Sequence, residues 1–358
     1  MAVNLTVRDY SLVGLDAKRA EERGLADAQW YASSIPRARL KELMQRRDQP
    51  AIRDTIIWFG LLGVTGTLGY LAWGHWWAVF PFLAYGALYG GSSDSRWHEC
   101  GHRTAFRTTW MNDVLYEIAS FMVMRESVIW RWSHTRHHTD TIIVGRDPEI
   151  AAPRPPSVLV FVLNLFGIKN GVHYFRTVTL HCCGRLTAEE ATFIPEMERS
   201  RVYRNARIYA LIYGAVVAAA VATRSILPLM YIGLPSFYGA WLMMLYGLTQ
   251  HAGLAEDVLD HRLNCRTVYF NRLNRFLYWE MNFHLEHHMF PMIPYHALEQ
   301  LHRELKADMP EPYPSIWAAY REIIPAMWRQ RKDPAYFVKR RLPPTAQPYR
   351  PETDDAHA

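Results

Sequence analysis

The chain has 358 residues, of which half are hydrophobic and 13% aromatic, and its 40 Lys and Arg against 34 Asp and Glu give a formal net charge of +6. This length suits two soluble domains or one membrane protein with a substantial water-facing part, and a mean hydropathy of −0.15 excludes a protein made mostly of membrane spans. The basic balance would suit nucleic acid, but no nucleic-acid-binding motif is present, so we expect a membrane and no nucleic-acid partner.

Residues 1–53 have the composition of polar cytosolic helices and loops, without the apolar core that a signal peptide carries. Residues 54–95 are expected to form a transmembrane hairpin. Its first run extends from Thr55 to about Val79, which exceeds the roughly 20 apolar residues that a span needs, and a second run follows at 80–91. The far-side turn is expected near Gly74, where tryptophans suit a membrane interface: Trp73, Trp76 and Trp77.

Residues 96–205 are more polar and are expected to form part of a cytosolic cap. Two apolar islands in it, 113–124 and 156–168, are too short for spans and are predicted to lie along the membrane surface. A second transmembrane hairpin is expected over 206–250, from two further runs: Ile208–Ala222 and Leu229–Leu248.

Residues 251–342 complete the expected cap, and the proline-rich tail 343–358 is predicted to be disordered. The fold class that we predict is therefore an all-α integral membrane protein, with four transmembrane helices in two hairpins and a cytosolic helical cap. Arginines flank the apolar runs on one side, while the turns near Gly74 and Arg224 are short and nearly uncharged. This asymmetry predicts that both termini and the cap lie in the cytoplasm. Because no cysteine pair has CxxC spacing, we expect reduced thiols at Cys100, Cys182, Cys183 and Cys265.

Three short histidine motifs are the strongest signal in the chain. One is an HxxxH motif at His98 and His102, and two are HxxHH motifs, with eight of the 16 histidines in all: His134, His137 and His138, then His284, His287 and His288. On a helix, residues four apart share one face, so each such pair can aim two imidazoles at one point, while His137 and His287 could reach a second point. Eight ligands exceed the four that close one structural zinc site, which predicts a dinuclear metal site in the cap. Imidazole suits iron, copper, zinc or nickel.

A ninth histidine, His251, ends the fourth apolar run at the level of these motifs, and we expect it to be a ligand as well. The other histidines are expected to be solvated or capping residues: His75, His173, His181, His261, His296, His302 and His357. Polar side chains near the motifs are candidates for orienting the imidazoles: Asp94, Glu99, Asp140, Asp147, Glu256, Asp260, Asn282 and Glu286.

The strings HECGH, HTRHH and HLEHH, together with the paired apolar runs, resemble the membrane-bound fatty acid desaturase and hydroxylase superfamily over about residues 50–300. The resemblance implies a helical stem in the bilayer, a cytosolic cap and a non-haem diiron centre that uses O2, with no catalytic residue separate from the metals. Carried over by position, the iron ligands would be His98, His102, His134, His137, His138, His251, His284, His287 and His288.

The chain departs from some branches of that superfamily. The first motif has three intervening residues where other branches have four. Stearoyl desaturases carry an Asn four residues before the histidine that ends the fourth span, whereas this chain has Gly247, so their water-mediated contact is not implied here. The alkane hydroxylase motifs are not matched, and no cytochrome b5 segment is fused.

The strings SSDSRWHECGH, HTDTIIVGRDPE and QHAGLAEDVLDHR are similar to a bacterial branch of hydrocarbon oxygenases of rhizopine catabolism. This similarity implies a bacterial inner membrane and electrons from a separate Rieske-type ferredoxin with its reductase. A basic stretch near the C-terminus suits either phospholipid or an acidic ferredoxin: Arg329, Arg331, Lys332, Lys339, Arg340 and Arg341.

Three functions compete at this stage. One is a desaturase or monooxygenase acting on a lipid acyl chain, and another is an oxygenase that removes an O-methyl group from a small polar substrate such as rhizopine. A metal transporter or sensor is disfavoured because the apolar runs are almost free of charge. A narrow apolar tunnel of about 15 Å or more would favour an acyl chain, whereas a short cavity with carboxylates would favour a polar amine.

Overall fold

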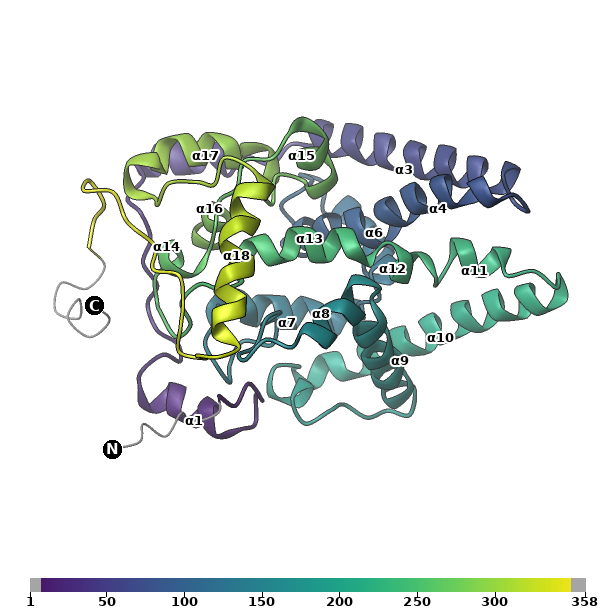
Figure 1. Cartoon of the computed structure of the whole chain (residues 1–358), viewed down its shortest axis with the longest axis horizontal. Helices are drawn as coiled ribbons and strands as arrows, with labels where there is room; N and C mark the ends of the chain where they lie inside the picture. The colour runs from purple at the N-terminus through teal and green to yellow at the C-terminus, as the bar shows by residue number, and fades with distance from the viewer. Residues whose placement is uncertain (1–7, 349–358) are drawn as a thin grey trace.

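The computed structural model describes residues 8–348, and these residues form helices and loops with no β-strand, which confirms the predicted all-α class. Four helical segments project together to one side and are called the stem here (Figure 1): α3 (Asp48–Leu71), α4 (Val79–Gly86), α10 (Arg199–Ala222) and α11 (Leu227–Tyr231). Most of the other helices gather at the opposite end and form the cap, while α9 (Ile168–Cys182) and α12 (Pro235–Tyr238) lie beside the base of the stem.

Two helices in the described part of the chain are long and apolar enough to cross a membrane, Arg37–Leu71 and Glu196–Ala222. A third candidate joins α8 (Val158–Leu165) and α9 (Ile168–Cys182), which meet at an angle of 77°. The structure therefore contains fewer unbroken spans than the four that the apolar runs predict.

The runs that fail as single spans are interrupted for local reasons. The first run does not reach Val79, because α3 ends at Leu71 and a turn follows in which Gly74 has a φ of +91°. The fourth run is broken near Gly233, which has a φ of +98°, and divides into three helices: α11, α12 (Pro235–Tyr238) and α13 (Ala240–His251).

The second run continues from α4 through a π-helical turn, Ala87–Ser92, into α5 (Ser93–Gly101), which carries the first histidine motif. The cap is completed by short helices: α1 (Leu15–Glu22), α2 (Arg37–Leu43), α6 (Thr109–Met122), α7 (Ser127–Thr139), α14 (His261–Asn264), α15 (Arg272–Tyr278), α16 (His284–Met289), α17 (Leu298–Leu305) and α18 (Ile316–Gln330). Short 3₁₀ turns lie at Trp76–Ala78, Glu190–Thr192, Glu196–Glu198, Tyr295–Ala297 and Lys306–Asp308.

Small residues let the second and fourth apolar runs cross closely where the stem meets the cap. A Cβ atom on Gly239 would lie 1.8 Å from the carbonyl oxygen of Gly86, and one on Gly90 would lie 2.4 Å from that of Pro235. Backbones approach this closely only where side chains are absent. The crossing brings the end of α13, with His251, toward the start of α5.

Arg96 fixes α5 to the segment before α16. Its side chain is completely buried, its guanidinium lies 5.0 Å from the ring centroids of both Trp58 and Trp279, and its Nη1 donates to the carbonyl of Leu277 at 2.9 Å. Because a buried guanidinium needs such partners, this residue sets the position of the first histidine motif against the third.

The chain segment after α18 returns across the cap. The backbone nitrogen of Gln347 donates to Asp308 at 2.8 Å, and its carbonyl accepts from Arg262 at 2.9 Å. The remainder of the predicted disordered tail, residues 349–358, lies outside the described residues.

Replacement of Gly239 by Ala is expected to destabilise the protein by about 1–3 kcal/mol or more, because the added methyl group collides with backbone rather than with a movable side chain. The matched control is Gly214→Ala in α10, where a Cβ meets nothing within 4 Å and a helical Ala is favourable. Thermal unfolding midpoints in detergent test this: a Gly239→Ala midpoint at or above that of the control contradicts the close crossing.

Candidate metal centre

Nine histidines converge in the cap as two adjacent groups. The first group has five side chains whose ring nitrogens lie within 4.8 Å of one another: His98, His102, His134, His138 and His287. The second group has four, within the same limit: His137, His251, His284 and His288. These are the nine histidines that the sequence singled out, and they come from α5, α7, α13 and α16 and the residue that follows α5.

Each HxxHH motif contributes one histidine to the group that contains the other two histidines of the other motif. His137 of α7 lies in the second group and His287 of α16 lies in the first, although the other two histidines of each motif belong to the opposite group. A residue three positions along a helix is rotated by about 60° from residue i and by about 100° from residue i+4. The pairs therefore meet as expected, but His137 and His287 do not share a second point; each one completes the group of the other motif.

Ring nitrogens within each group are in direct contact. The Nε2 atom of His134 lies 3.0 Å from Nε2 of His102 and 3.2 Å from Nε2 of His138. In the second group, Nε2 of His284 lies 2.9 Å from Nε2 of His251 and 3.0 Å from Nε2 of His288. Two nitrogens bound at right angles to one ion at about 2.1 Å are about 3.0 Å apart, so this spacing fits metal coordination.

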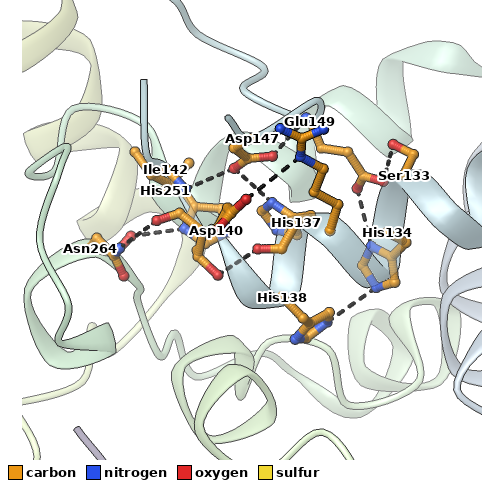
Figure 2. A network of polar contacts seen from close by, with 12 residues as sticks. Ser133, His134, His137, His138, Asp140, Ile142, Asp147, Glu149, His251 and Asn264 are labelled. Atoms are coloured by element: carbon orange, nitrogen blue, oxygen red, sulfur yellow. Dashed lines mark hydrogen bonds and ion pairs between the residues drawn. The ribbon is translucent and has the colours of Figure 1, made fainter. Parts of the chain in front are cut away.

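In three of the rings, the hydrogen bond made by the outer nitrogen, Nδ1, shows that Nε2 is left for a metal (Figure 2). Nδ1 of His134 donates to Glu149 at 3.1 Å, and Nδ1 of His137 donates to Asp147 at 2.8 Å. Nδ1 of His251 donates to the carbonyl oxygen of Asn264 at 2.8 Å. Since a neutral imidazole has a single N–H, the Nε2 atoms of these rings carry lone pairs. These lone pairs point into the two groups, where a cation can accept them, and the residues therefore fit a pair of metal ions.

Burial favours the neutral, metal-binding form of most of these rings; His137 is the exception, because Asp147 outweighs the effect of burial and raises its pKa. The pKa values of His98, His138 and His288 lie well below the usual value because burial disfavours the charged ring and neighbouring imidazoles add to the effect. Burial alone would raise the pKa of Glu149, but the imidazole of His134 lowers it to about 2, so this carboxylate remains an acceptor. Metal ions need not displace protons from such ligands.

Only two of the eight polar residues proposed for orienting the imidazoles lie against them. Asp147 contacts His137, and Glu99 Oε1 lies 3.8 Å from Nδ1 of His287. The others have different partners: Asp94 contacts Arg125, Asp140 contacts Arg146, Glu256 contacts Arg154, Asp260 contacts Arg262, Asn282 contacts the carbonyl of Val268, and Glu286 contacts His302 and Thr267.

Three orienting groups were missed by the sequence analysis: Glu149, Thr141 and the carbonyl of Asn264. The hydroxyl of Thr141 donates to the carbonyl of His137 at 2.7 Å and lies 3.2 Å from Nδ1 of His288, from which it accepts. Glu149 and Thr141 stand within 15 residues of the second motif, so proximity in the chain is the signal that could have found them.

His261 and Cys265 lie behind the second group rather than at the surface. His261 is buried and stacks on Trp30 with ring centroids 4.2 Å apart, and its ring nitrogen, the Cys265 thiol and a nitrogen of His288 lie within 4.8 Å of one another. The expectation that His261 is solvated is therefore wrong, because the loop after α13 folds back under His251.

Two cavities with some lining residues in common lie in the cap, and one of them adjoins the second histidine group. One of about 350 Å³ is lined by His137 and His251 together with charged and small residues: Asp94, Arg125, Glu149, Lys169 and Gly247. We call it the inner cavity. The other, the outer cavity, has about 340 Å³ and shares Arg125, Trp130 and Met243 with the first. A larger apolar groove of about 1000 Å³ lies between the stem helices, and none of the nine histidines lines it.

Comparison with known proteins gives one family. The sequence model of the family described as fatty acid desaturase matches residues 73–320, which include all nine histidines. The chain is 26% identical over 293 residues to the acyl-lipid (9+3)-(E)-desaturase of Dimorphotheca sinuata, covering 73% of this chain and 75% of that protein. It is 25% identical over 296 residues to the omega-6 fatty acid desaturase, endoplasmic reticulum, of Brassica juncea, with coverages of 75% and 74%.

Removal of the Glu149 carboxylate is expected to weaken metal binding by about 10–100-fold, because the orientation and basicity of His134 depend on it. Metal retained after dialysis against graded chelator, measured by elemental analysis, compares Glu149→Ala with wild type. Asp113→Ala is the matched control, since that carboxylate pairs with Arg103 at the surface. Equal retention in both variants would show that Glu149 does not support the site.

Proposed function

The chain belongs to the fatty acid desaturase family, and we propose that it is a membrane-bound non-haem diiron oxidoreductase that uses O2 to desaturate or hydroxylate an unactivated C–H bond. The observation that carries this proposal is the convergence of nine imidazoles in two adjacent groups. Iron held there would supply the dioxygen activation that breaking such a bond requires, since no side chain is a strong enough oxidant.

The residues of the chain itself would bind the metals, orient the ligands and shield the site from water. Asp147 and Glu149 hold two imidazoles in the tautomer that presents Nε2 to the interior. The inner cavity reaches His137 and His251, so a substrate carbon placed there lies against the second group. Apart from these ligands we assign no catalytic residue, and the chain contributes position and exclusion of water.

The proposal includes a membrane setting. The long helices Arg37–Leu71 and Glu196–Ala222 would cross the bilayer, and the broken second and fourth runs would complete two hairpins beside them. The arginine distribution would then place both termini and the cap in the cytoplasm. We propose the inner membrane of a bacterium as the location, on the motif similarities given above.

His287→Ala is expected to abolish product formation, by at least about 100-fold, because it removes one ligand of the first group. Lipid and small-metabolite mass spectrometry of cells expressing each variant would reveal the product as a gain of oxygen, a loss of two hydrogens or a loss of a methyl group. The control is His75→Ala, an exposed histidine stacked on Trp77 far from the centre. Undiminished product with His287→Ala would refute the proposed reaction centre.

A second substrate class is favoured by one observation. The cavity that touches the histidines bears Asp94, Arg125 and Glu149, whereas the larger, mostly apolar groove does not reach them. Hydroxylation of a methoxy carbon of a small polar molecule, such as rhizopine, would give an unstable hemiacetal and hence O-demethylation.

Electrons would come from a ferredoxin, of Rieske type by the motif similarity, and its reductase. The basic surface proposed for its docking consists of Arg329, Arg331, Lys332, Lys339 and Arg341, which are exposed and form no salt bridge within residues 8–348. Arg340 does not belong to it, because its side chain is half-buried and donates to Tyr313 at 2.6 Å. The backbone of Val338 donates to the carbonyl of Gly253 at 2.9 Å, two residues after His251, so this surface covers a short path to the second group.

Reversal of two of these charges, Lys332→Glu with Lys339→Glu, is expected to slow the reduction of the proposed metal centre by an acidic [2Fe–2S] ferredoxin by about tenfold. The rate of this reduction should also depend less on salt concentration. Reduction by dithionite, a small anion that needs no protein interface, should change little. The matched control is Lys18→Glu with Lys306→Glu, two exposed lysines elsewhere on the cap. If the control pair slows the ferredoxin equally, the effect is one of net charge and the docking site is wrong.

A further inference from the structure

We propose that Asp94 and Arg125 form a recognition pair in the inner cavity and that the substrate carries a hydroxyl or amino group which this pair binds. The inference rests on the proposed function and names the substrate class within it: a small polar molecule rather than an acyl chain.

The pair is held in place on the cavity wall. Asp94 lies on α5, one helical turn before His98, and Arg125 follows α6. The guanidinium of Arg125 lies 4.0 Å from the ring centroid of Trp97 and 4.4 Å from that of Trp130. These aromatic contacts and the ion pair with Asp94 orient the guanidinium without help from a ligand.

Several hydrogen-bonding atoms of this pair have weak partners or none. Nη1 of Arg125 donates to Oδ1 of Asp94, and Nη2 has only the sulfur of Met243, at 4.0 Å. Within residues 8–348, Oδ2 of Asp94 and Nε of Arg125 have no hydrogen-bonding partner. A hydroxyl or amino group both donates and accepts, and thus complements an acceptor beside donors. A methylene chain would desolvate the charged groups and return no hydrogen bond.

The volume of the inner cavity, about 350 Å³, suits a small ligand. The cavity is lined by His137 and His251 at the second histidine group, and it shares Arg125, Trp130 and Met243 with the outer cavity. Gly247, one helical turn before His251, keeps the inner cavity open: a Cβ there would meet nothing within 4 Å. A molecule bound here would have its reacting carbon at the second histidine group and its polar group at Asp94 and Arg125.

Three probes with different polar character test the inference on the metal-loaded protein in detergent, supplied with O2, an acidic [2Fe–2S] ferredoxin, its reductase and NADPH. They are 2-methoxycyclohexanol, methoxycyclohexane and oleate. Each methyl ether oxidation consumes one O2, two electrons and two protons, inserts one oxygen atom into a methyl C–H bond and releases water; the hemiacetal then breaks into an alcohol and formaldehyde, which is measured. Oleate products are measured by mass spectrometry.

We expect kcat/KM for 2-methoxycyclohexanol to exceed that for methoxycyclohexane by about 100-fold, the usual effect of a hydrogen bond to a charged group in a dry site. Asp94→Asn and Arg125→Met should each remove this preference by lowering kcat/KM for 2-methoxycyclohexanol only. The metal content of both variants should be unchanged. The surface pair Asp113→Asn and Arg103→Met is the matched control. Gly247→Leu should block oxidation of both ethers while retaining metal, and Gly214→Leu, with equal space in α10, should not.

A preference for oleate or methoxycyclohexane, or a preference for the alcohol that survives in both cavity variants, overturns the inference. So does NADPH-dependent oxygen consumption with no oxidation of any probe, an outcome that leaves the proposed oxidoreductase standing. If metal-loaded wild type neither consumes oxygen nor oxidises a probe, the proposed function itself is refuted.

Discussion

The convergence of buried imidazole nitrogens is the constraint on which the cap depends. Nine rings form two adjacent groups, in each of which the ring nitrogens lie within 4.8 Å of one another, and several rings have their outer nitrogen committed to a carboxylate or carbonyl. Burial lowers the pKa of most of these rings, whereas Asp147 raises that of His137. A cation among the inner nitrogens would bind the neutral rings, and metal binding would then be coupled to the folding of the cap.

That constraint explains the way in which the chain is assembled. The ligands are distributed over helices far apart in sequence, and α7 and α16 exchange one histidine so that neither group can form without the other motif. Two of these helices, α5 and α13, continue from apolar runs that begin in the stem. The close crossing of Gly86 and Gly239 aligns α5 with α13, and Arg96 ties α5 to the segment before α16. Side chains remote from the metals thus set their separation.

The same ligand frame can accommodate different substrates, because fold and metal ligation do not decide what enters the cavity. The plant relatives are named for acyl-lipid and fatty acid substrates, and they share about a quarter of their residues with this chain. The space next to the second histidine group here has about 350 Å³ and is lined by apolar and charged side chains, with Asp94 and Arg125 on its wall and Gly247 leaving it open. On the proposal above, substrate choice would be decided on this wall rather than among the ligands.

The sequence by itself determined the helical class, the identity of the nine histidines and the family, because helical spacing is local and imidazoles at i and i+4 must share a face. It could not determine how the nine divide, since the assignment of His137 and His287 depends on which helix lies opposite. Nor could it find Glu149 or Thr141, or exclude Asp140 and Glu286, because hydrogen-bond partners are chosen by the course of a loop in space. The close glycine crossing and the ion pair in the cavity beside His251 likewise arose only from tertiary packing, because contacts between distant segments decide them.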